Sequence, residues 1–277
     1  WREFNVADLD GDGRQEIVLV DHGEAGGRAP RLMVWGVDGT LRWSRTLEAG
    51  DPELDAPVIG DITGDGRLEI LVDTGASGAI AAFTAEGEPL GGHWPVSPGG
   101  NHHGKILADV TGDGRLELIS WSVPPNDLIG ERTRRLAVIS GEGRVLRRWE
   151  LPGCEEDDAV PEFLPVVARW GVGRELAVVV AEDCGTLSAW DVRQEKPLWR
   201  TSTPVRWAAS PVAGDLDNDG LDEIVIGGVR RGPGQAGGVY VFQADGQIRP
   251  GWPVVEEASF SGAAALADLT GDGQLEI

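Results

Sequence analysis

The chain has 277 residues, with 46 acidic and 24 basic residues that give a formal net charge of −22. Such a charge disfavours nucleic acid and anionic membrane surfaces as partners, because the long-range field repels both, and it makes cations the more natural ligands. Hydrophobic residues make up 41% of the chain, too many for a disordered segment, and the apolar runs are too short to cross a bilayer. We therefore expect a globular, water-soluble protein.

One acidic pattern recurs along the chain and indicates a repeat architecture. It reads Asp-Leu-Asp-Gly-Asp-Gly-Arg-Gln-Glu-Ile at residues 8–17 and returns at residues 61–70, 109–118, 215–224 and 268–277. A degenerate copy at residues 168–177 keeps both glycines and the arginine but has lost the acidic positions. The copies lie about 50 residues apart, and a period of this length with strands inside each unit is typical of propeller blades.

Strand-forming segments surround each copy. In the second unit, residues 56–60 precede the acidic loop, residues 69–73 follow it, and residues 79–84 come after a glycine-rich turn. The third and fourth strands of the other units are predicted as hairpins with tight glycine turns. These pairs are residues 31–35 with 40–44, 136–140 with 144–149, 187–191 with 197–201, and 239–243 with 247–251.

These elements predict an all-β fold, a β-propeller of four-stranded antiparallel blades. We expect a single β-propeller domain over residues 1–277, with blade repeats that start near residues 1, 55, 102, 161, 208 and 261. This gives five full blades and the start of a sixth, so we expect a fragment of a seven- or eight-bladed propeller that is incomplete at one or both ends. The alternative is a five-bladed propeller with a redundant tail.

The repeated loop resembles the FG-GAP and VCBS-type repeats of secreted bacterial propellers and of integrin α subunits. The segment Gly251-Trp252-Pro253-Val254 ahead of a new repeat, echoed by residues 93–96, looks like the bacterial branch. The resemblance covers essentially the whole chain and implies a calcium-binding β-propeller. It does not imply one activity, because such propellers serve as adhesive, scaffolding and occasionally polysaccharide-cleaving modules.

The acidic loops are candidate calcium sites. Calcium takes six to eight oxygen ligands, which side chains at alternate loop positions and one backbone carbonyl can supply. In the first loop the ligands at positions 1, 3, 5, 7 and 9 are Asp8, Asp10, Asp12, the Arg14 carbonyl and Glu16, the last as a bidentate ligand. The equivalent residues elsewhere are Asp61, Thr63, Asp65, Arg67 and Glu69; Asp109, Thr111, Asp113, Arg115 and Glu117; Asp215, Asp217, Asp219, Leu221 and Glu223; and Asp268, Thr270, Asp272, Gln274 and Glu276.

We therefore expect up to five structural Ca²⁺ ions, with weaker binding in the loops that have threonine at position 3. The alternative is that these Asp and Gly residues form ordinary turns. Five copies in one register favour ion binding.

Other residue types give further expectations. Cys154 and Cys184 are predicted to form a disulfide, because alternating strands place both on one face of the unit whose acidic loop has degenerated; two free buried thiols are the alternative. Repeated tryptophans on the third and fourth strands are predicted to pack between blades. These are Trp35, Trp190, Trp43, Trp149 and Trp199. The stretch at residues 185–200 also resembles the tryptophan-docked blades of quinoprotein dehydrogenases, although the adjacent cysteines of those enzymes are missing here.

No catalytic constellation stands out, so the sequence predicts a non-enzymatic, calcium-stabilised propeller. We expect it to act as an adhesion, scaffolding or protein-interaction module of a secreted, periplasmic or cell-surface protein. The alternative is a carbohydrate-active propeller, a lectin or polysaccharide lyase module, with sugars stacked on exposed tryptophans such as Trp121 or Trp207.

A protein partner or a glycan is expected on the face opposite the calcium loops, with no nucleic acid and no direct membrane insertion by this segment. Three long loops, at residues 21–30, 122–134 and 227–238, are predicted to carry that surface, because binding often resides in loops on a rigid scaffold. Their arginines are Arg28, Arg132, Arg134, Arg230 and Arg231.

Overall fold

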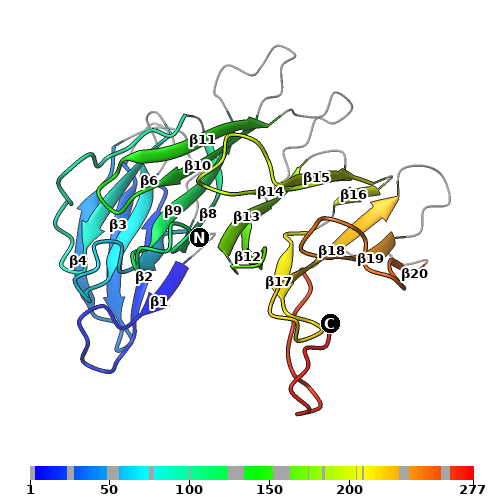
Figure 1. Cartoon of the computed structure of the whole chain (residues 1–277). Coiled ribbons are helices and arrows are strands. Elements are labelled where there is room, and N and C mark those ends of the chain that lie inside the picture. The colour runs from blue at the N-terminus through cyan, green and yellow to red at the C-terminus, as the bar shows by residue number, and fades with distance from the viewer. Residues whose placement is uncertain are drawn as a thin grey trace. The chain divides into compact units, whose positions relative to one another are not determined.

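Every named element of the structure, a computed structural model, is a β-strand, and paired strands run antiparallel (Figure 1). The described residues are 4–23, 28–48, 56–74, 78–99, 101–123, 134–151, 163–173, 175–182, 185–203, 205–207, 209–230, 237–256 and 263–277. The strands fall into two compact units, one with β1 to β11 and one with β12 to β20. No helix in the described ranges is long and apolar enough to cross a membrane. The predicted all-β fold is confirmed.

The first unit contains three sheets, which we call blades 1 to 3. Blade 1 has the strand order β1-β2-β3-β4, formed by Phe4–Ala7, Glu16–Asp21, Arg31–Gly36 and Leu41–Thr46. Blade 2 has three strands, β5, β6 and β7, formed by Val58–Gly60, Glu69–Thr74 and Ala79–Thr84. Blade 3 contains β8 to β11, formed by Asn101–Ala108, Glu117–Val123, Arg134–Ile139 and Val145–Leu151.

The second unit contains blades 4 and 5 and the beginning of a further repeat. Blade 4 has the order β12-β13-β14-β15, formed by Val166–Trp170, Glu175–Glu182, Thr186–Trp190 and Trp199–Ser202. In blade 5, β16 and β17 both pair with β18, which is followed by β19 and β20; these strands are Val205–Trp207, Val212–Gly214, Glu223–Arg230, Gly237–Phe242 and Val254–Glu256. A single bridge between Ala267 and Glu276 opens the next repeat.

The outer strand of blades 2 and 5 differs from the prediction. The segment 247–251 of blade 5 makes one bridge, from Ile248 to Phe242, and the regular strand β20 forms only at 254–256. Blade 2 likewise has two isolated bridges in place of a fourth strand. Each segment contains a Trp-Pro pair with a cis peptide bond, at 94–95 and 252–253. Because proline has no N–H to donate, it interrupts the ladder at these points.

The predicted packing of tryptophans between blades is confirmed for Trp43 and Trp199. The Trp43 Nε1 of blade 1 donates to the Ala85 carbonyl in the turn between the third and fourth strands of blade 2, at 2.9 Å. Trp199 of blade 4 donates to the Ala244 carbonyl in the same turn of blade 5, at 2.8 Å. Trp94 of blade 2 reaches the corresponding turn of blade 3. Within each unit, an indole on one blade therefore covers a turn of the next.

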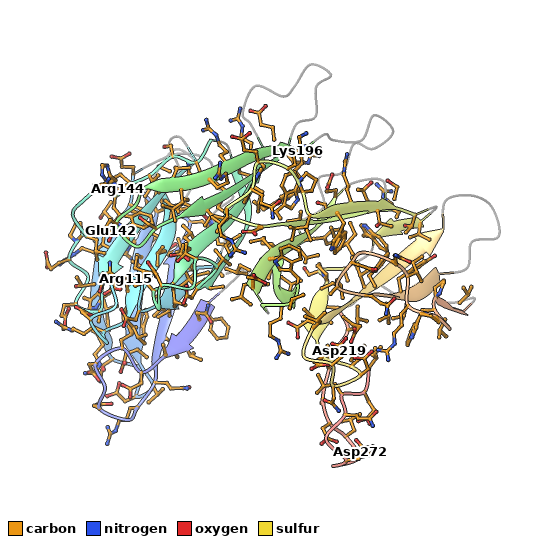
Figure 2. The ribbon with its side chains drawn as sticks, viewed as in Figure 1. Arg115, Glu142, Arg144, Lys196, Asp219 and Asp272 are labelled. Carbon is orange, nitrogen blue, oxygen red and sulfur yellow. The ribbon has the colours of Figure 1, made fainter. Side chains whose placement is uncertain are left out.

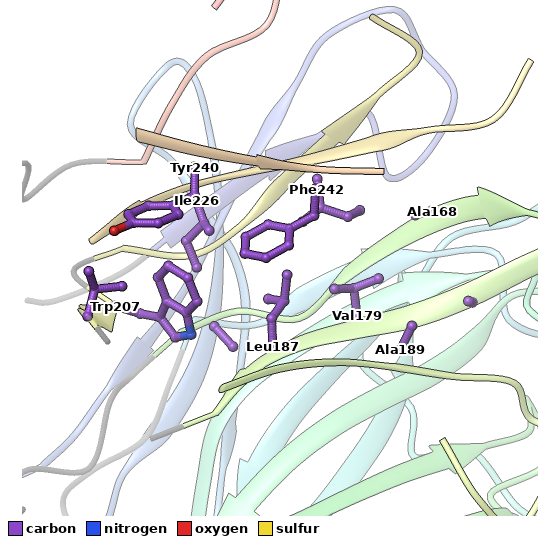
Figure 3. Packing of buried hydrophobic residues seen from close by; sticks show 12 residues of the cluster. Ala168, Val179, Leu187, Ala189, Trp207, Ile226, Tyr240 and Phe242 are labelled. Atoms are coloured by element: carbon purple, nitrogen blue, oxygen red, sulfur yellow. The ribbon is translucent and has the colours of Figure 1, made fainter. Parts of the chain in front are cut away.

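The cores lie between neighbouring blades, as Figure 3 shows for blades 4 and 5. Blade 4 supplies mostly small side chains, such as Ala168 and Ala189, and blade 5 supplies Trp207, Tyr240 and Phe242. The Trp207 ring meets the Tyr240 and Phe242 rings edge-on, with centroids 5.7 and 6.0 Å apart. Small side chains on one sheet thus make room for aromatic rings on the next.

This packing corrects the expectation that Trp121 and Trp207 are exposed. Trp121 is 1% exposed and Trp207 is 4% exposed, so neither ring can stack on a sugar. Cys154 and Cys184 lie outside the described residues, and their pairing stays a prediction. Most residues of the three long loops also lie outside the described residues.

Candidate metal centre

The acidic loops join the first and second strands of their blades, and we number them 1, 2, 3, 5 and 6 in repeat order. In loop 1, the carboxylate of Asp8 accepts hydrogen bonds from the backbone N–H groups of Gly11, Asp12 and Gly13, at 2.8, 3.1 and 2.9 Å. Gly11 and Gly13 have φ values of 76° and 85°, a conformation that glycine adopts without strain. The equivalent aspartates of the other loops accept the same type of bond; they are Asp61, Asp109, Asp215 and Asp268. The pattern Asp-x-x-Gly-x-Gly, with Asn218 at φ 61° in place of the first glycine in loop 5, therefore folds the loop around its first carboxylate.

A glutamate at position 9 closes each loop at the start of the second strand. The Glu16 Oε2 accepts the Leu9 N–H at 3.0 Å, and Glu69, Glu223 and Glu276 make the equivalent bond within 3.0 Å. Glu16, Glu69, Glu117 and Glu223 are each at most 3% exposed. Buried carboxylates are costly unless hydrogen bonds or opposite charges compensate them, and a cation beside these glutamates would add such compensation.

Three loops bring acidic oxygens close enough for one ion. In each of three groups, one oxygen from every member lies within 4.8 Å of the others. The groups are Asp8, Asp10 and Glu16; Asp215, Asp217 and Glu223; and Asp268, Asp272 and Glu276. Loops 2 and 3 are fully described and show no such trio; both have threonine at position 3.

The position-5 aspartates differ between loops. Asp12 and Asp219 stay outside the trios of loops 1 and 5. Each accepts the N–H of the residue two positions later, at 2.7 Å, a bond that Asp272 of the loop 6 trio also makes, at 2.9 Å. Figure 2 labels Asp219 and Asp272 in loops 5 and 6, which touch through a 3.3 Å hydrogen bond from the Asn218 side chain to the Gly273 carbonyl.

The electrostatics of the loops also favour a cation. Burial raises the pKa of Glu69, and the nearby Asp65 and Asp61 raise it further, against the opposing Ile62 and Thr63 N–H groups. Burial likewise raises the pKa of Glu223, with a smaller contribution from Asp217. A raised carboxyl pKa means that the surroundings oppose the negative charge, which a bound cation would stabilise.

Two buried oxygens test whether the loops fit a metal. Glu16 Oε1 and Thr63 Oγ1 are buried and have no hydrogen-bond partner, although Arg42 lies 3.7 Å from the former. They occupy positions 9 and 3, two of the predicted ligand positions. The donors are carboxylate, hydroxyl and carbonyl oxygens, the set that hard divalent cations prefer. The loops therefore fit such an ion.

In each blade with an acidic loop, that loop and the turn between the third and fourth strands lie at the same end of the strands, and so on the same face of the propeller. The Arg115 side chain of loop 3 reaches Glu142 in the turn of blade 3, at 3.1 Å (Figure 2). Arg67 of loop 2 forms the equivalent ion pair with Glu86. Because strands alternate in direction, the connections from β2 to β3, from β9 to β10 and from β18 to β19 start at the opposite end of the strands. The strands are longer than predicted here, since residues 21, 122–123, 134, 227–230 and 237–238 of the three expected loops belong to them.

Blade 4 has an ion pair near its degenerate loop. The Arg169 guanidinium contacts the Asp222 carboxylate, with Nη2 to Oδ1 at 2.6 Å, and the Arg169 backbone N–H donates to the same side chain at 2.7 Å. The side-chain hydrogen bond to Asp222 and the negative charge of that carboxylate raise the pKa of Arg169. Sequence reasoning missed this pair. The available signal was Asp222 itself, because the other loops have Gln or Leu at that position.

Comparison with known proteins agrees with this geometry. A family model described as FG-GAP-like repeat matches residues 8–72 and 215–277. The chain carries FG-GAP-like repeats. A search of curated proteins gave no significant match.

Solved structures similar to this FG-GAP-repeat chain are propeller proteins. Rhamnogalacturonan lyase YesW is 16% identical with a TM-score of 0.58, over 98% of this chain and 63% of the lyase. Quinohemoprotein alcohol dehydrogenase from Comamonas testosteroni is 12% identical with a TM-score of 0.52, over 88% of this chain and 52% of the enzyme. A europium-containing methanol dehydrogenase is 12% identical with a TM-score of 0.51, over 95% and 63%. The chain thus spans less than two thirds of each enzyme, and the likeness at this identity shows the β-propeller fold alone.

Proposed function

We propose that this chain is a calcium-stabilised, non-enzymatic β-propeller that acts as an adhesion, scaffolding or protein-interaction module of a secreted or cell-envelope protein. The observation that carries the proposal is the buried Glu16, whose Oε1 has no hydrogen-bond partner. It lies in a loop whose other oxygens are suitable ligands for a cation. The side chains at positions 1, 3, 5 and 9 and the carbonyl at position 7 would hold the ion. When bound, calcium supplies positive charge that neutralises the carboxylates.

The chain's own residues determine what the ion would stabilise. Position 1 lies just after the first strand of a blade, and the position-9 glutamate begins the second strand. An ion held by both therefore ties two neighbouring strands together. A compartment outside the cytoplasm suits this role, because extracellular calcium modules bind the ion at the concentrations found there.

A partner is proposed on the face opposite the acidic loops. Loops longer than a structural hairpin needs, on a rigid scaffold, are common binding surfaces. At the base of the first long loop, Arg28 pairs with Asp21 through two hydrogen bonds, of 2.5 and 2.9 Å. This ion pair places charged groups at the base of the loop.

The second candidate is a carbohydrate-active module, favoured by the likeness of the fold to rhamnogalacturonan lyase YesW. Because Trp121 and Trp207 are buried, a sugar would have to bind elsewhere. A glycan array, with tryptophan quenching by the oligosaccharides that bind, separates this candidate from protein adhesion.

Thermal melting with excess chelator and with millimolar calcium tests the ion. We expect calcium to raise the melting temperature, because each saturated site adds about 2–3 kcal/mol at 100-fold excess over Kd. Asp8→Asn should reduce the shift. Asp38→Asn, in the turn of the same blade and outside the loop, should preserve it. An unchanged melting temperature in calcium would refute the calcium proposal.

The partner surface needs a separate experiment. The residues between the flanking strands, 22–30, 124–133 and 231–236, are each replaced by four-residue turns, and adhesion or pull-down is measured on protein that still shows the calcium-dependent melt. We expect binding to be lost. Retained binding in folded protein would place the functional surface elsewhere.

A further inference from the structure

One position on the outer segment brings an arginine to the acidic loop in blades 1 and 5. It lies two residues after the turn between the third and fourth strands, whose closing hydrogen bonds are the same in blades 1, 2, 3 and 5. The residue there is Arg42 in blade 1, Leu90 in blade 2, Leu146 in blade 3 and Arg249 in blade 5. We call it the facing position.

Both arginines lie beside the carboxylates of their loops. The Arg42 Nη2 is 3.7 Å from Glu16 Oε1, the buried oxygen without a hydrogen-bond partner. The Arg249 Nη1 is 3.6 Å from Glu223 Oε2, and its Nη2 is 3.4 Å from Asp217 Oδ2. Both guanidinium groups therefore approach the closing glutamate of the loop. Since both glutamates are buried, solvent screens these contacts less than an ordinary surface pair.

The facing position varies together with position 3 of the loop. Loops 1 and 5 have aspartate at position 3, Asp10 and Asp217, and an arginine at the facing position. Loops 2 and 3 have threonine at position 3 and a leucine at the facing position. The extra carboxylate is thus matched by one extra positive charge. Counted over the side chains at positions 1, 3, 5 and 9 and the facing position, both kinds of loop would then carry the same net charge with a divalent ion bound.

We propose that Arg42 and Arg249 set the cation affinity of loops 1 and 5. A guanidinium near the ligand carboxylates opposes a divalent cation, whereas the position-3 aspartate attracts it. In the ion-free loop, the same guanidinium stabilises the crowded carboxylates. This inference rests on the proposed calcium binding and adds to it the residues that regulate affinity.

The test uses variants that convert one kind of loop into the other. Arg42→Leu and Asp10→Thr are made separately and together. The double variant gives loop 1 the same residue types as loops 2 and 3 at both positions. Leu146→Arg makes the reverse change in blade 3, where Leu146 is 41% exposed and can be replaced without loss of core packing. Arg148→Leu, an exposed arginine on β11 away from the facing position, controls for net charge.

Calcium affinity is measured loop by loop in protein labelled with ¹⁵N-glycine. Gly13, Gly66 and Gly114 donate to the position-1 aspartates of loops 1, 2 and 3, so each amide signal reports one loop. We expect Arg42→Leu to tighten loop 1 about tenfold and Leu146→Arg to weaken loop 3 about tenfold, the effect of one nearby charge. The double variant of loop 1 should bind like loop 2. Arg148→Leu should change none of them.

A second readout does not depend on bound calcium. In excess chelator, Arg42→Leu should lower the melting temperature by a few degrees, and Asp10→Thr in the same chain should restore it. If the wild-type glycine amides respond to calcium but Arg42→Leu leaves loop 1 unchanged or weaker, this inference is overturned and the calcium proposal stands. If no wild-type amide responds, both fail.

Discussion

At the scale of single residues, the first aspartate of each acidic loop has two tasks. It is a candidate ion ligand, and it also accepts the backbone N–H groups that hold the loop in shape. In loop 2, Asp61 accepts N–H groups from Gly64, Asp65 and Gly66, whereas Asp65 accepts only that of Arg67. The first carboxylate therefore contributes most of the side-chain hydrogen bonds that shape the loop.

This difference predicts unequal costs of two substitutions in excess chelator. Asp61→Ala should lower the free energy of unfolding by about 1–3 kcal/mol, because several backbone donors lose their acceptor. Asp65→Ala should cost clearly less. Urea unfolding without metal measures both, and equal costs would show that the loop is shaped by something other than its first carboxylate.

How far the sequence predicts the site depends on the separation of its parts. The loop ligands follow one another within nine residues, so spacing alone assigned them. The Arg169–Asp222 pair joins residues 53 positions apart in different repeats. An arginine or an aspartate in a sequence can equally face solvent or a distant partner, so the residue types alone do not predict the pair. Arg42 and Arg249 were missed for the same reason, because they face their loops across a sheet.

At the scale of elements, glycines in the turns between third and fourth strands allow indole rings of the preceding blade to pack closely against Gly87, Gly143 and Gly246. Gly87 and Gly39 both have φ near 82°, so alanine at either position carries the same backbone strain. A Cβ on Gly87 would lie 2.9 Å from the Trp43 ring, whereas a Cβ on Gly39 would meet nothing within 4 Å. The two positions differ only in what covers them.

Gly87→Ala should therefore destabilise the protein more than Gly39→Ala, by about 1–3 kcal/mol from overpacking against the indole. Chemical denaturation of both variants gives the difference. The total tryptophan fluorescence, to which Trp43 contributes, should shift with Gly87→Ala and not with Gly39→Ala. Equal destabilisation would mean that the indole moves aside at no cost.

The Arg169–Asp222 pair gives a second prediction at this scale. A double-mutant cycle with Arg169→Ala and Asp222→Ala should yield a coupling of about 1–3 kcal/mol between blades 4 and 5. Because Asp222 lies in loop 5 directly before the proposed ligand Glu223, the cycle is measured in chelator, where no ion competes for its carboxylate. The Arg193–Asp191 pair, with hydrogen bonds of 2.8 and 2.9 Å inside one blade, is the matched reference. A coupling near zero would make the pair incidental.

At the scale of the whole molecule, periodicity predicted the blades but not which side chains they hide. The middle strands of a blade are covered on both faces by their neighbours, so β6 and β14 are buried at every position. Alternation of buried and exposed residues, which marks a half-buried strand, is lost there. Trp121 on β9 was for that reason wrongly taken as exposed.

The predicted Cys154–Cys184 disulfide also belongs to this scale, because it would close a loop of about 30 residues and add roughly 3–4 kcal/mol in the chain-entropy model. Thiol titration of denatured, unreduced protein should find no free thiol, and the protein should migrate as a monomer without reductant. The reduced sample should titrate two. Two free thiols before reduction would exclude the bond.

The direction of the tryptophan contacts has a consequence for biosynthesis. Trp43, Trp94 and Trp199 each precede the turn they cover, by 42, 47 and 45 residues. On the ribosome, each of these tryptophans is therefore synthesised before the turn that it contacts. Its indole ring stays uncovered until the next blade has emerged. Translation that pauses between blades would leave a tryptophan-bearing sheet edge open to chaperones or to aggregation.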